Sequence, residues 1–385
     1  MKRIYLDHNA TTPVRKEVLD AMMPYFTEEY GNASSVYSLG QNARHAIDES
    51  REIIGNAIGT EAADIIFTSG GTESDNFAIK GVAMANLNKG RHVITSAVEH
   101  MAVLEPCRFI EKELGFDVTY LPVDKYGMVD LNQLKDSIRK DTILISIMFA
   151  NNETGTIQPV KEISKIARAN KIYFHTDAVQ ALGKLPIDVE ESGIDMCSFS
   201  GHKIYGPKGI GALYLRKGVK ITAFQHGGHH ERGKRAGTEN VPGIVGFAKA
   251  VEIAQRDMKK NEVLLKNLTK KMWDGLNKNM KEIYLNGHPE NRISNTLNIS
   301  FKYVEGESMV LNFDMKGIYA STGSACTSGS LDPSHVLNAM GVPPDLAQSS
   351  VRFSFGYENT EEDVDYCLSE IPPIVERLRK MSPRC

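Results

Sequence analysis

A lysine and an aspartate, each at the end of an apolar run, are the residues of this chain best suited to chemistry. Residues 172–174 lead into Asp177, and residues 196–199 lead into a small polar loop that carries Lys203. Parallel strands end at one sheet edge, so the two runs would bring a carboxylate and an amine together. A lysine can form a Schiff base with a carbonyl cofactor, and a carboxylate can keep a pyridine nitrogen protonated. The pair suits pyridoxal phosphate (PLP), although an ordinary α/β protein with a surface lysine and a strand-end aspartate would show the same pattern.

Two further segments add to this pattern. Residues 65–71 run from a strand-like stretch into a glycine turn, and the following residues favour a helix whose first N–H groups could bind a phosphate. Thr72 adds a hydroxyl there and is expected to cap that helix. Residues 321–330 form a small polar loop with Cys326 in its middle. Such a loop is typical of an exposed, working thiol, with an incidental loop cysteine as the alternative.

These segments together closely resemble the NifS/IscS-type cysteine desulfurases, within the fold-type I PLP enzymes. The resemblance spans nearly the whole chain, from residues 4–13 to residues 377–383. Its motifs lie at residues 72–76, 99–100, 151–153, 200–203 and 235–238 and in the Cys326 loop. Enzymes of this family take sulfur from L-cysteine and leave L-alanine. They hold the sulfur as a persulfide on the loop cysteine and pass it to iron–sulfur cluster scaffold proteins or other acceptors.

The resemblance implies a role for each matching residue. Lys203 is expected to carry PLP and then move protons, and Asp177 to pair with the pyridine N–H. Gln180 is expected to donate to the ring hydroxyl, and His100 to stack on the pyridine face and shuttle a proton. Together with Cys326, Lys203 and His100 form the expected catalytic set. The phosphate is expected to bind small polar donors, namely Gly71, Thr72, Ser200 and His202, with Thr238 reaching it from the neighbouring subunit.

Arg352 lies in the strand-like run 351–353, where a buried arginine needs an anionic partner. The resemblance implies that this partner is the substrate carboxylate, which the planar guanidinium can bind through two hydrogen bonds. Asn152 is expected at the same carboxylate or at the PLP ring hydroxyl. An internal salt bridge is the alternative for Arg352. Cys326 could also ligate iron transiently in a scaffold-bound cluster.

Residues 226–231 contain three histidines and a glutamate, a set that could bind a transition metal. The family motif runs through this segment into residues 235–238, which reach the neighbouring subunit in relatives. We therefore expect an interface loop here rather than a metal site. The same resemblance implies a homodimer with two shared active sites.

Two other classes of function compete with a desulfurase. Another PLP enzyme, such as an aminotransferase or a selenocysteine lyase, would use the same cofactor residues. An aminotransferase, however, needs no thiol in the Cys326 loop. A non-catalytic sulfur carrier or cluster-assembly subunit would not need Lys203, His100 and Asp177.

The bulk properties favour a cytoplasmic enzyme. The chain has 385 residues and a net charge of −3, with no long block of like charge, so neither nucleic-acid nor membrane binding is expected. The first residues contain no apolar signal region. Many bacterial relatives continue beyond the equivalent of residue 383, so scaffold docking is expected to differ here. The cysteines lack paired zinc spacing and do not resemble a disulfide framework; they are Cys107, Cys197, Cys326, Cys367 and Cys385.

The order of the predicted elements indicates an α/β fold of the fold-type I PLP-dependent transferase class. Apolar runs at residues 64–68, 92–96, 118–121, 143–149, 172–176 and 212–215 predict strands, with amphipathic helices between them at 42–58, 101–114 and 160–169. This alternation predicts a mostly parallel central sheet. A long helix over 245–278, strands at 296–301 and 350–355 and a final helix over 361–381 predict a smaller α+β domain. We expect a large domain at residues 15–255, and a small domain at 1–14 and 256–385 that carries the Cys326 loop and Arg352.

Overall fold

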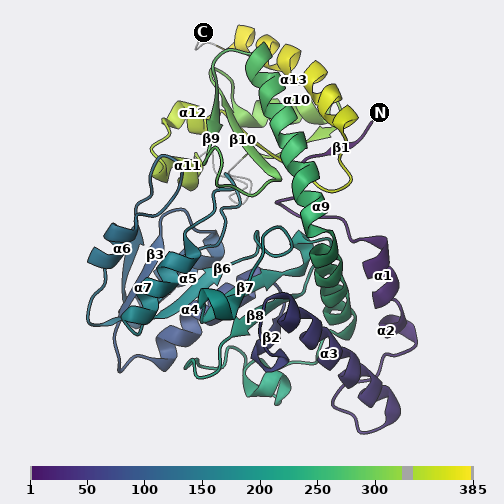
Figure 1. The fold of residues 1–385 in the computed structure, drawn as a ribbon, viewed down its shortest axis with the longest axis vertical. Helices are drawn as coiled ribbons and strands as arrows, with labels where there is room; N and C mark the ends of the chain where they lie inside the picture. Colours follow the sequence, from purple (N-terminus) through teal and green to yellow (C-terminus); the bar gives the residue numbers. More distant parts are fainter. Residues whose placement is uncertain (1, 323–332, 383–385) are drawn as a thin grey trace.

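A seven-stranded sheet forms the centre of the larger lobe of the molecule (Figure 1). The computed structural model describes residues 2–322 and 333–382. The strand order is β2-β8-β7-β6-β5-β3-β4. The strands β3 to β7 run parallel to one another, and β8 is antiparallel to both β2 and β7. The mostly parallel sheet is thereby confirmed. The strands are β2 Ile65–Thr68, β3 His92–Ser96, β4 Asp117–Leu121, β5 Thr142–Ser146, β6 Tyr173–Asp177, β7 Met196–Ser200 and β8 Gly211–Leu215.

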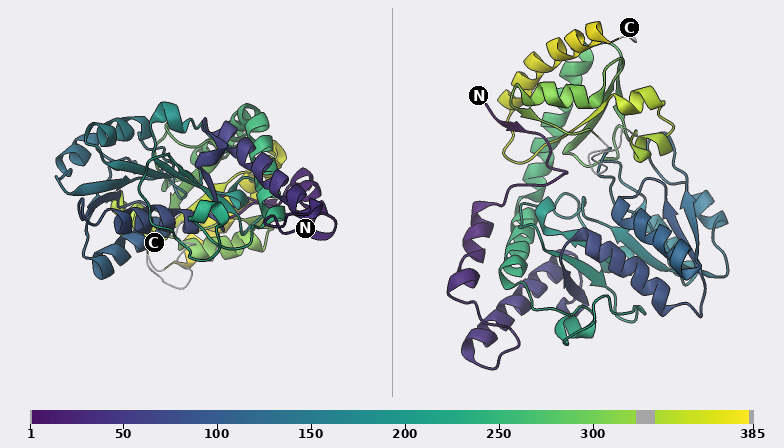
Figure 2. Two further views of the ribbon diagram at one scale, coloured as in Figure 1. Left: turned by 90° about the horizontal axis from the view of Figure 1, so that it is seen from below. Right: turned by 180° about the vertical axis from the view of Figure 1, so that it is seen from behind.

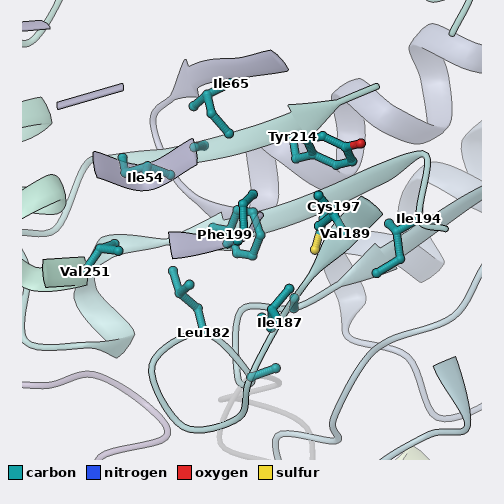
Figure 3. Packing of buried hydrophobic residues seen from close by; sticks show 14 of the residues in the cluster. Ile54, Ile65, Leu182, Ile187, Val189, Ile194, Cys197, Phe199, Tyr214 and Val251 are labelled. Atoms are coloured by element: carbon teal, nitrogen blue, oxygen red, sulfur yellow. The ribbon is translucent and has the colours of Figure 1, made fainter. Parts of the chain in front are cut away.

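Helices cover both faces of this sheet, which explains why its strands are apolar without strict alternation. Adjacent strand residues such as Ile65 and Ile66 are both buried, but they belong to different apolar clusters on opposite faces. One cluster includes residues of α4 and α5, and the other includes residues of α3, α7 and α9. Figure 3 shows part of the second cluster, where Ile54 and Val251 from helices meet Cys197, Phe199 and Tyr214 from strands. The helices are α1 Lys16–Met22, α2 Pro24–Thr27, α3 Ser38–Ala57, α4 Gly71–Ala85, α5 Met101–Leu114, α6 Leu131–Asp136, α7 Val160–Ala169 and α8 Val189–Ser192.

A second, antiparallel sheet of order β12-β10-β9 forms the smaller lobe, together with the short parallel pair of β1 and β11. Its apolar cluster is separate and draws Ile4 and Leu6 from the start of the chain to residues beyond 264. The first strand and the last helix therefore lie in the same lobe (Figure 2). The elements are β1 Ile4–Tyr5, β9 Ile283–Asn286, β10 Thr296–Phe301, β11 Ile318–Tyr319, β12 Ser350–Ser354, α10 Gly306–Asp314, α11 His335–Ala339, α12 Pro344–Gln348 and α13 Glu361–Met381.

The helix α9, Val241–Asn279, links the two lobes (Figure 1). The side chain of Asn240 caps its start by accepting from the N–H of Gly243. Buried residues up to Ile253 belong to the large-lobe core, and those from Leu265 onward belong to the small-lobe core. We retain residues 15–255, and 1–14 with 256–385, as a proposed division of the chain into domains.

Two details differ from the expectations. The helix α4 begins at Gly71 with Gly70 as its cap residue, so Thr72 lies inside the first turn and does not cap it. The strand β5 ends at Ser146, three residues before the end of the apolar run, although the next residues still run beside β6: the N–H groups of Ile147 and Phe149 donate to the carbonyls of His175 and Asp177 at 3.1 and 2.8 Å. The described residues also contain three short 3₁₀ helices: η1 Ala62–Asp64, η2 Gly201–Lys203 and η3 His230–Gly233. In the described part of the chain, no helix is long and apolar enough to cross a membrane.

Candidate active site

A cavity of about 290 Å³ lies where β6 and β7 end and α4 begins. Parallel strands present their carboxyl ends at one edge, which is where open α/β sheets bind ligands. Nearly all the site residues expected from the sequence line this one cavity: Gly71, Thr72, His100, Asn152, Asp177, Gln180, Ser200, His202, Lys203 and Arg352.

Asp177 is the last residue of β6, and its carboxylate lies at the cavity wall. One of its oxygens, Oδ1, accepts the N–H of Val179 at 2.9 Å. Burial raises the pKa of Asp177, while the nearby His100 and Lys203 act in the opposite direction. The carboxyl group is therefore held in a buried setting that favours an incoming N–H cation as its partner.

Lys203 ends the short helix η2, directly after β7. Its Nζ donates to the carbonyl oxygens of Asn9 and Ala10 at 2.6 and 2.8 Å. These carbonyls come from the segment that follows β1, so the start of the chain positions the amine. The amine lies in the same cavity as the Asp177 carboxylate, as the sequence predicted.

His100 is the cap residue of α5, and its Nδ1 accepts the backbone N–H of Ala102 at 3.1 Å. Burial, with a smaller contribution from Lys203, lowers the pKa of this imidazole. Because Nδ1 is an acceptor, the neutral ring carries its proton on Nε2. A partly buried neutral imidazole on the cavity wall can both stack on a flat ring and exchange one proton.

The start of α4 forms a cradle for an anion. Gly70 has φ +154°, a conformation that side chains rarely adopt, and a Cβ on Gly71 would lie 2.6 Å from Cγ2 of Val179. The glycines thus let the first turn of a helix face the cavity with its N–H groups. Ser200 and His202 line the same end of the site. Burial, and then the charge of Lys203, lower the pKa of His202 to about 4.

Arg352 projects from β12 and is almost fully buried. Its Nη2 pairs with Oδ1 of Asp7 at 2.7 Å, and its Nη1 donates to the carbonyl of Asn152 at 3.1 Å. An internal salt bridge, the alternative considered from the sequence, is therefore present. Within the described part of the chain, Nε of Arg352 is buried without a hydrogen-bond partner. The guanidinium borders the cavity and retains a donor that a bound anion could use.

Sequence reasoning assigned no role to Asp75, which lies in α4 and also borders the cavity. Its carboxyl group is buried, and its Oδ1 has no hydrogen-bond partner among the described residues. It lies 3.6 Å from Nε2 of His175. Burial, followed by the charge of Asp177, raises the pKa of Asp75 well above its usual range. Its position one turn inside a helix that starts at the cavity was the signal that could have found it.

Two further site residues were expected from the sequence, Thr238 and Cys326. Thr238 is exposed and does not line the cavity of its own chain. Cys326 lies outside the described residues. The chain reaches that segment from Ser321, which is paired with Arg352 through backbone hydrogen bonds of 2.7 and 3.2 Å. It leaves through Ser334, whose hydroxyl donates to buried Glu153 at 2.5 Å.

Two side chains of the segment 226–231, those of His230 and Glu231, make other contacts. Both carboxylate oxygens of Glu231 accept from Arg51 at 2.7 and 2.8 Å, and one also accepts the N–H of Phe67. Nδ1 of His230 accepts the N–H of Gly237. Among residues 2–322 and 333–382, no group of three or more His, Cys, Asp and Glu side chains is placed to hold a metal ion.

Comparison with known proteins identifies the family to which this chain belongs. Residues 4–367 match the model of the class-V aminotransferase family, so the chain belongs to that family, whose members are PLP enzymes. A protein of Methanosarcina thermophila named cysteine desulfurase IscS is 58% identical over 382 residues, covering 99% of this chain and 94% of that protein. One of the same name from Dictyoglomus turgidum is 56% identical, covering 100% and 97%.

Solved structures agree with this placement. A NifS-like protein superposes with a TM-score of 0.93 at 41% identity, covering 98% of this chain and all of that one. A NifS-like protein from Rickettsia africae superposes with a TM-score of 0.88 at 32% identity, covering 97% and 100%. Within the class-V aminotransferases, the chain thus belongs to the NifS/IscS-type cysteine desulfurase group.

Proposed function

We propose that this protein is a PLP-dependent cysteine desulfurase. It converts L-cysteine to L-alanine and holds the released sulfur as a persulfide on Cys326. The observation that carries the proposal is the convergence of Lys203, Asp177, His100 and Arg352 on one cavity, although they come from segments up to 252 residues apart, from position 100 to position 352. The high identity to proteins named cysteine desulfurase IscS selects this chemistry within the family.

The cavity suits PLP at three points. The start of α4, with Ser200 and His202, would hold the phosphate, and the buried Asp177 carboxylate would pair with the pyridine N–H. Lys203 supplies the amine in the same cavity. When bound, PLP would supply a carbonyl that condenses with amines and a ring that withdraws electrons from the substrate carbon. A selenocysteine lyase or an aminotransferase would share these features, so the thiol decides between them.

Arg352 would bind the substrate carboxylate, with Asn152 beside it. Its buried Nε, and the Nη groups now shared with Asp7 and the Asn152 carbonyl, supply donors at the small-lobe side of the cavity. Lys203 would then move protons at the substrate carbon, and the Nε2 proton of His100 is available to the same region.

The sulfur needs a nucleophilic thiol, and three of the five cysteines are unsuited to that task. Cys107, Cys197 and Cys367 are free and buried, and burial raises the pKa of each thiol, to about 12 in Cys367. A thiol attacks as its thiolate, so these groups are unreactive near neutral pH. Cys326 and Cys385 remain, and Cys326 is the one whose surrounding sequence matches the family loop.

The overall step balances without an added oxidant. The Cys326 sulfur forms an S–S bond to the substrate sulfur while the C–S bond of cysteine breaks. The electron pair of that bond stays on the substrate carbon, which takes a proton to become the methyl group of alanine. Cys326 then carries a persulfide, and its terminal sulfur could be transferred to a second thiol or to an iron–sulfur scaffold protein. During this transfer, Cys326 could also act as a transient ligand of iron in a scaffold-bound cluster.

The protein is further proposed to act as a homodimer in the cytoplasm. Thr238 is exposed and absent from its own chain's cavity, which agrees with a role at a neighbouring subunit's phosphate site. Free cysteines and a persulfide product suit a reducing compartment. Iron–sulfur scaffold proteins or other thiol acceptors are the proposed partners.

The proposed function is tested by incubating the PLP-loaded protein with L-cysteine and dithiothreitol. We expect alanine and sulfide in equal amounts, and a persulfide on the peptide that contains Cys326 by mass spectrometry without reductant. Cys326→Ser should bind PLP but lose sulfide release, whereas Cys385→Ser should keep it. Lys203→Ala should lose turnover.

Persulfide on Cys385 instead, or normal turnover by Cys326→Ser, would overturn the assignment of the thiol. Transamination of cysteine without sulfide release would identify an aminotransferase and overturn the proposed activity.

A further inference from the structure

A second lysine, Lys184, lies near the site and shares a small cavity with Lys203. Lys184 is partly buried and lines a small cavity of about 50 Å³ between the lobes, which Lys203, His8 and residues of α9 also line. It forms no ion pair with any of the described residues, and its charged neighbours are Lys203 and Arg352. Burial, then these two positive charges, lower the pKa of Lys184 to about 7. An amine held under such conditions near a ligand cavity is a candidate for a functional role.

The contact made by Lys184 is specific. Its Nζ donates to Oε1 of Gln180 at 2.7 Å, and Nε2 of Gln180 donates to the carbonyl oxygen of Asn9 at 3.0 Å. Asn9 is also the residue whose carbonyl accepts from Lys203. The Gln180 carboxamide and the Asn9 carbonyl therefore connect Lys184 to Lys203 through hydrogen bonds.

This arrangement leaves the carboxamide only one favourable orientation. In its protonated form the Lys184 amine donates hydrogen bonds and cannot accept them, so the Gln180 oxygen then faces Lys184. The Asn9 carbonyl only accepts, so the Gln180 amino group must face it. Rotating the carboxamide by 180° would place donor against donor and acceptor against acceptor. With the observed orientation, the second N–H of Gln180 remains to serve a ligand, and Gln180 lines the larger cavity.

We propose that Lys184 is a positioning residue, which fixes Gln180 so that this N–H is presented to the oxygen on the PLP ring. The proposal rests on the proposed function, because it concerns the cofactor of that site. Lys184 itself lines the small cavity and not the larger one, so it acts through Gln180. Without the Lys184 donor, only the Asn9 carbonyl still orients the carboxamide, so the reversed orientation, in which the Gln180 oxygen faces the ring oxygen and the two acceptors repel, is less strongly disfavoured.

The test compares two cofactors that differ only at the ring oxygen. The full-length protein is freed of cofactor and titrated with PLP or with 3-deoxypyridoxal 5′-phosphate, which lacks the phenolic oxygen but retains the aldehyde and phosphate. We expect Lys184→Met to weaken PLP binding by about 10-fold, the typical effect of losing one hydrogen bond to a charged group. Binding of the deoxy analogue should change less than twofold.

Further variants separate positioning from folding. Lys184→Arg keeps a donor-only cation and should restore most of the PLP affinity, while Lys217→Met, at an exposed lysine, should have no effect. In a Gln180→Ala background, Lys184→Met should cause no further loss, because there is no carboxamide left to orient.

Equal weakening for PLP and the deoxy analogue, or additive losses in the double variant, would overturn the proposal and leave Lys184 a structural residue. Unchanged binding of both cofactors by Lys184→Met would also overturn it. In each case wild-type binding of PLP is measured in parallel. Failure of the wild type to bind PLP would instead contradict the proposed function.

Discussion

At the scale of single residues, the site depends on buried charges with few partners. Arg352, Asp75, Asp177 and Glu99 all lie at or beside one cavity and are all buried. Burial raises the pKa of each of the three carboxyl groups. A cationic or hydrogen-bond-donating ligand would recover part of this cost, which gives the cavity its preference for such ligands.

The role of Arg352 can be separated from its ion pair with Asp7. We expect Arg352→Ala to raise the KM for L-cysteine by about 100-fold, because loss of one member of a buried charge-assisted pair costs about 2–5 kcal/mol. Arg352→Lys should recover only part of this, since an ammonium lacks the fork of a guanidinium. Steady-state kinetics at saturating PLP measure the effect.

The matched control is Asp7→Asn, which removes the internal pair but leaves the guanidinium in place. Its KM should stay within a few-fold of wild type. A KM raised as much as in Arg352→Ala would show that the arginine serves only its internal salt bridge.

Glu99 makes stability depend on pH. Burial raises its pKa to about 8, although hydrogen bonds from Ser96 and the Met148 N–H favour its charged form. The folded state therefore holds a proton that the unfolded chain releases near pH 4.5. The stability linked to this proton is fully present below about pH 4.5 and is lost as the pH rises through about 8.

Glu99→Gln stays neutral at every pH, so its free energy of unfolding should exceed that of wild type increasingly from pH 5 to pH 8.5. We expect a difference on the order of a few kcal/mol at the upper end. Urea unfolding at several pH values measures it, with Glu113→Gln, at a half-exposed glutamate, as the control. A difference that stays constant with pH would contradict the assignment.

At the scale of elements, helix ends and strand ends do most of the positioning. His100 caps α5, Asp177 ends β6, and Lys203 follows β7 within one turn. The last helix, α13, is fixed differently. It begins with a capping box in which the Thr360 hydroxyl accepts the Asp363 N–H and the Asp363 carboxylate accepts the Thr360 N–H.

Thr360→Ala should lower the free energy of unfolding by about 1 kcal/mol, the usual cost of losing such a cap. Ser369→Ala, which removes an exposed hydroxyl in the middle of the same helix, should change it by less than about 0.5 kcal/mol. Chemical denaturation of both variants provides the comparison. Equal effects would mean that the cap contributes nothing beyond helix propensity.

At the scale of the whole molecule, the site lies between two separate cores. Among the described residues, the start of the chain and α9 each contribute side chains to both cores. Lys203 and Asp177 belong to the large lobe and Arg352 to the small one. The distance between cofactor and substrate groups therefore depends on how the lobes are held. Asn9 helps to hold the two lobes together, because it forms hydrogen bonds with Gln180 and Lys203 of the large lobe and with Thr296 of the small lobe.

If the proposed domains are separate folding units, damage to one core should stay local. Phe353→Ala removes a fully buried ring from the small-lobe core and should cost about 3–5 kcal/mol there. Hydrogen exchange should then speed up in β9, β10, β12 and α13 more than in β5, β6 and β7. Phe199→Ala, in the large-lobe core, should give the reverse pattern. Uniform loss of protection in both variants would show a single cooperative unit.

The sequence by itself determined the elements and the residues at their ends. Helices α5, α7 and α13 and strands β3 and β10 have the predicted bounds, because apolar periodicity and end signals such as Gly115 and Thr360 are local properties. Asp177 and Lys203 were identifiable from their positions after apolar runs, whereas the resemblance to the NifS/IscS-type family implied the roles of most other candidate site residues.

Only the tertiary structure decided the direction of the strands and the contacts between residues that are distant in sequence. Apolar runs report burial but not strand direction, so the antiparallel β8 was not predictable from its own residues. Asp7 and Arg352 pair across 345 positions, and Lys184 reaches the site only through Gln180. Such contacts depend on how distant segments pack, and no local pattern encodes them. The position of Thr238 outside its own cavity has the same origin, because packing places it on the surface.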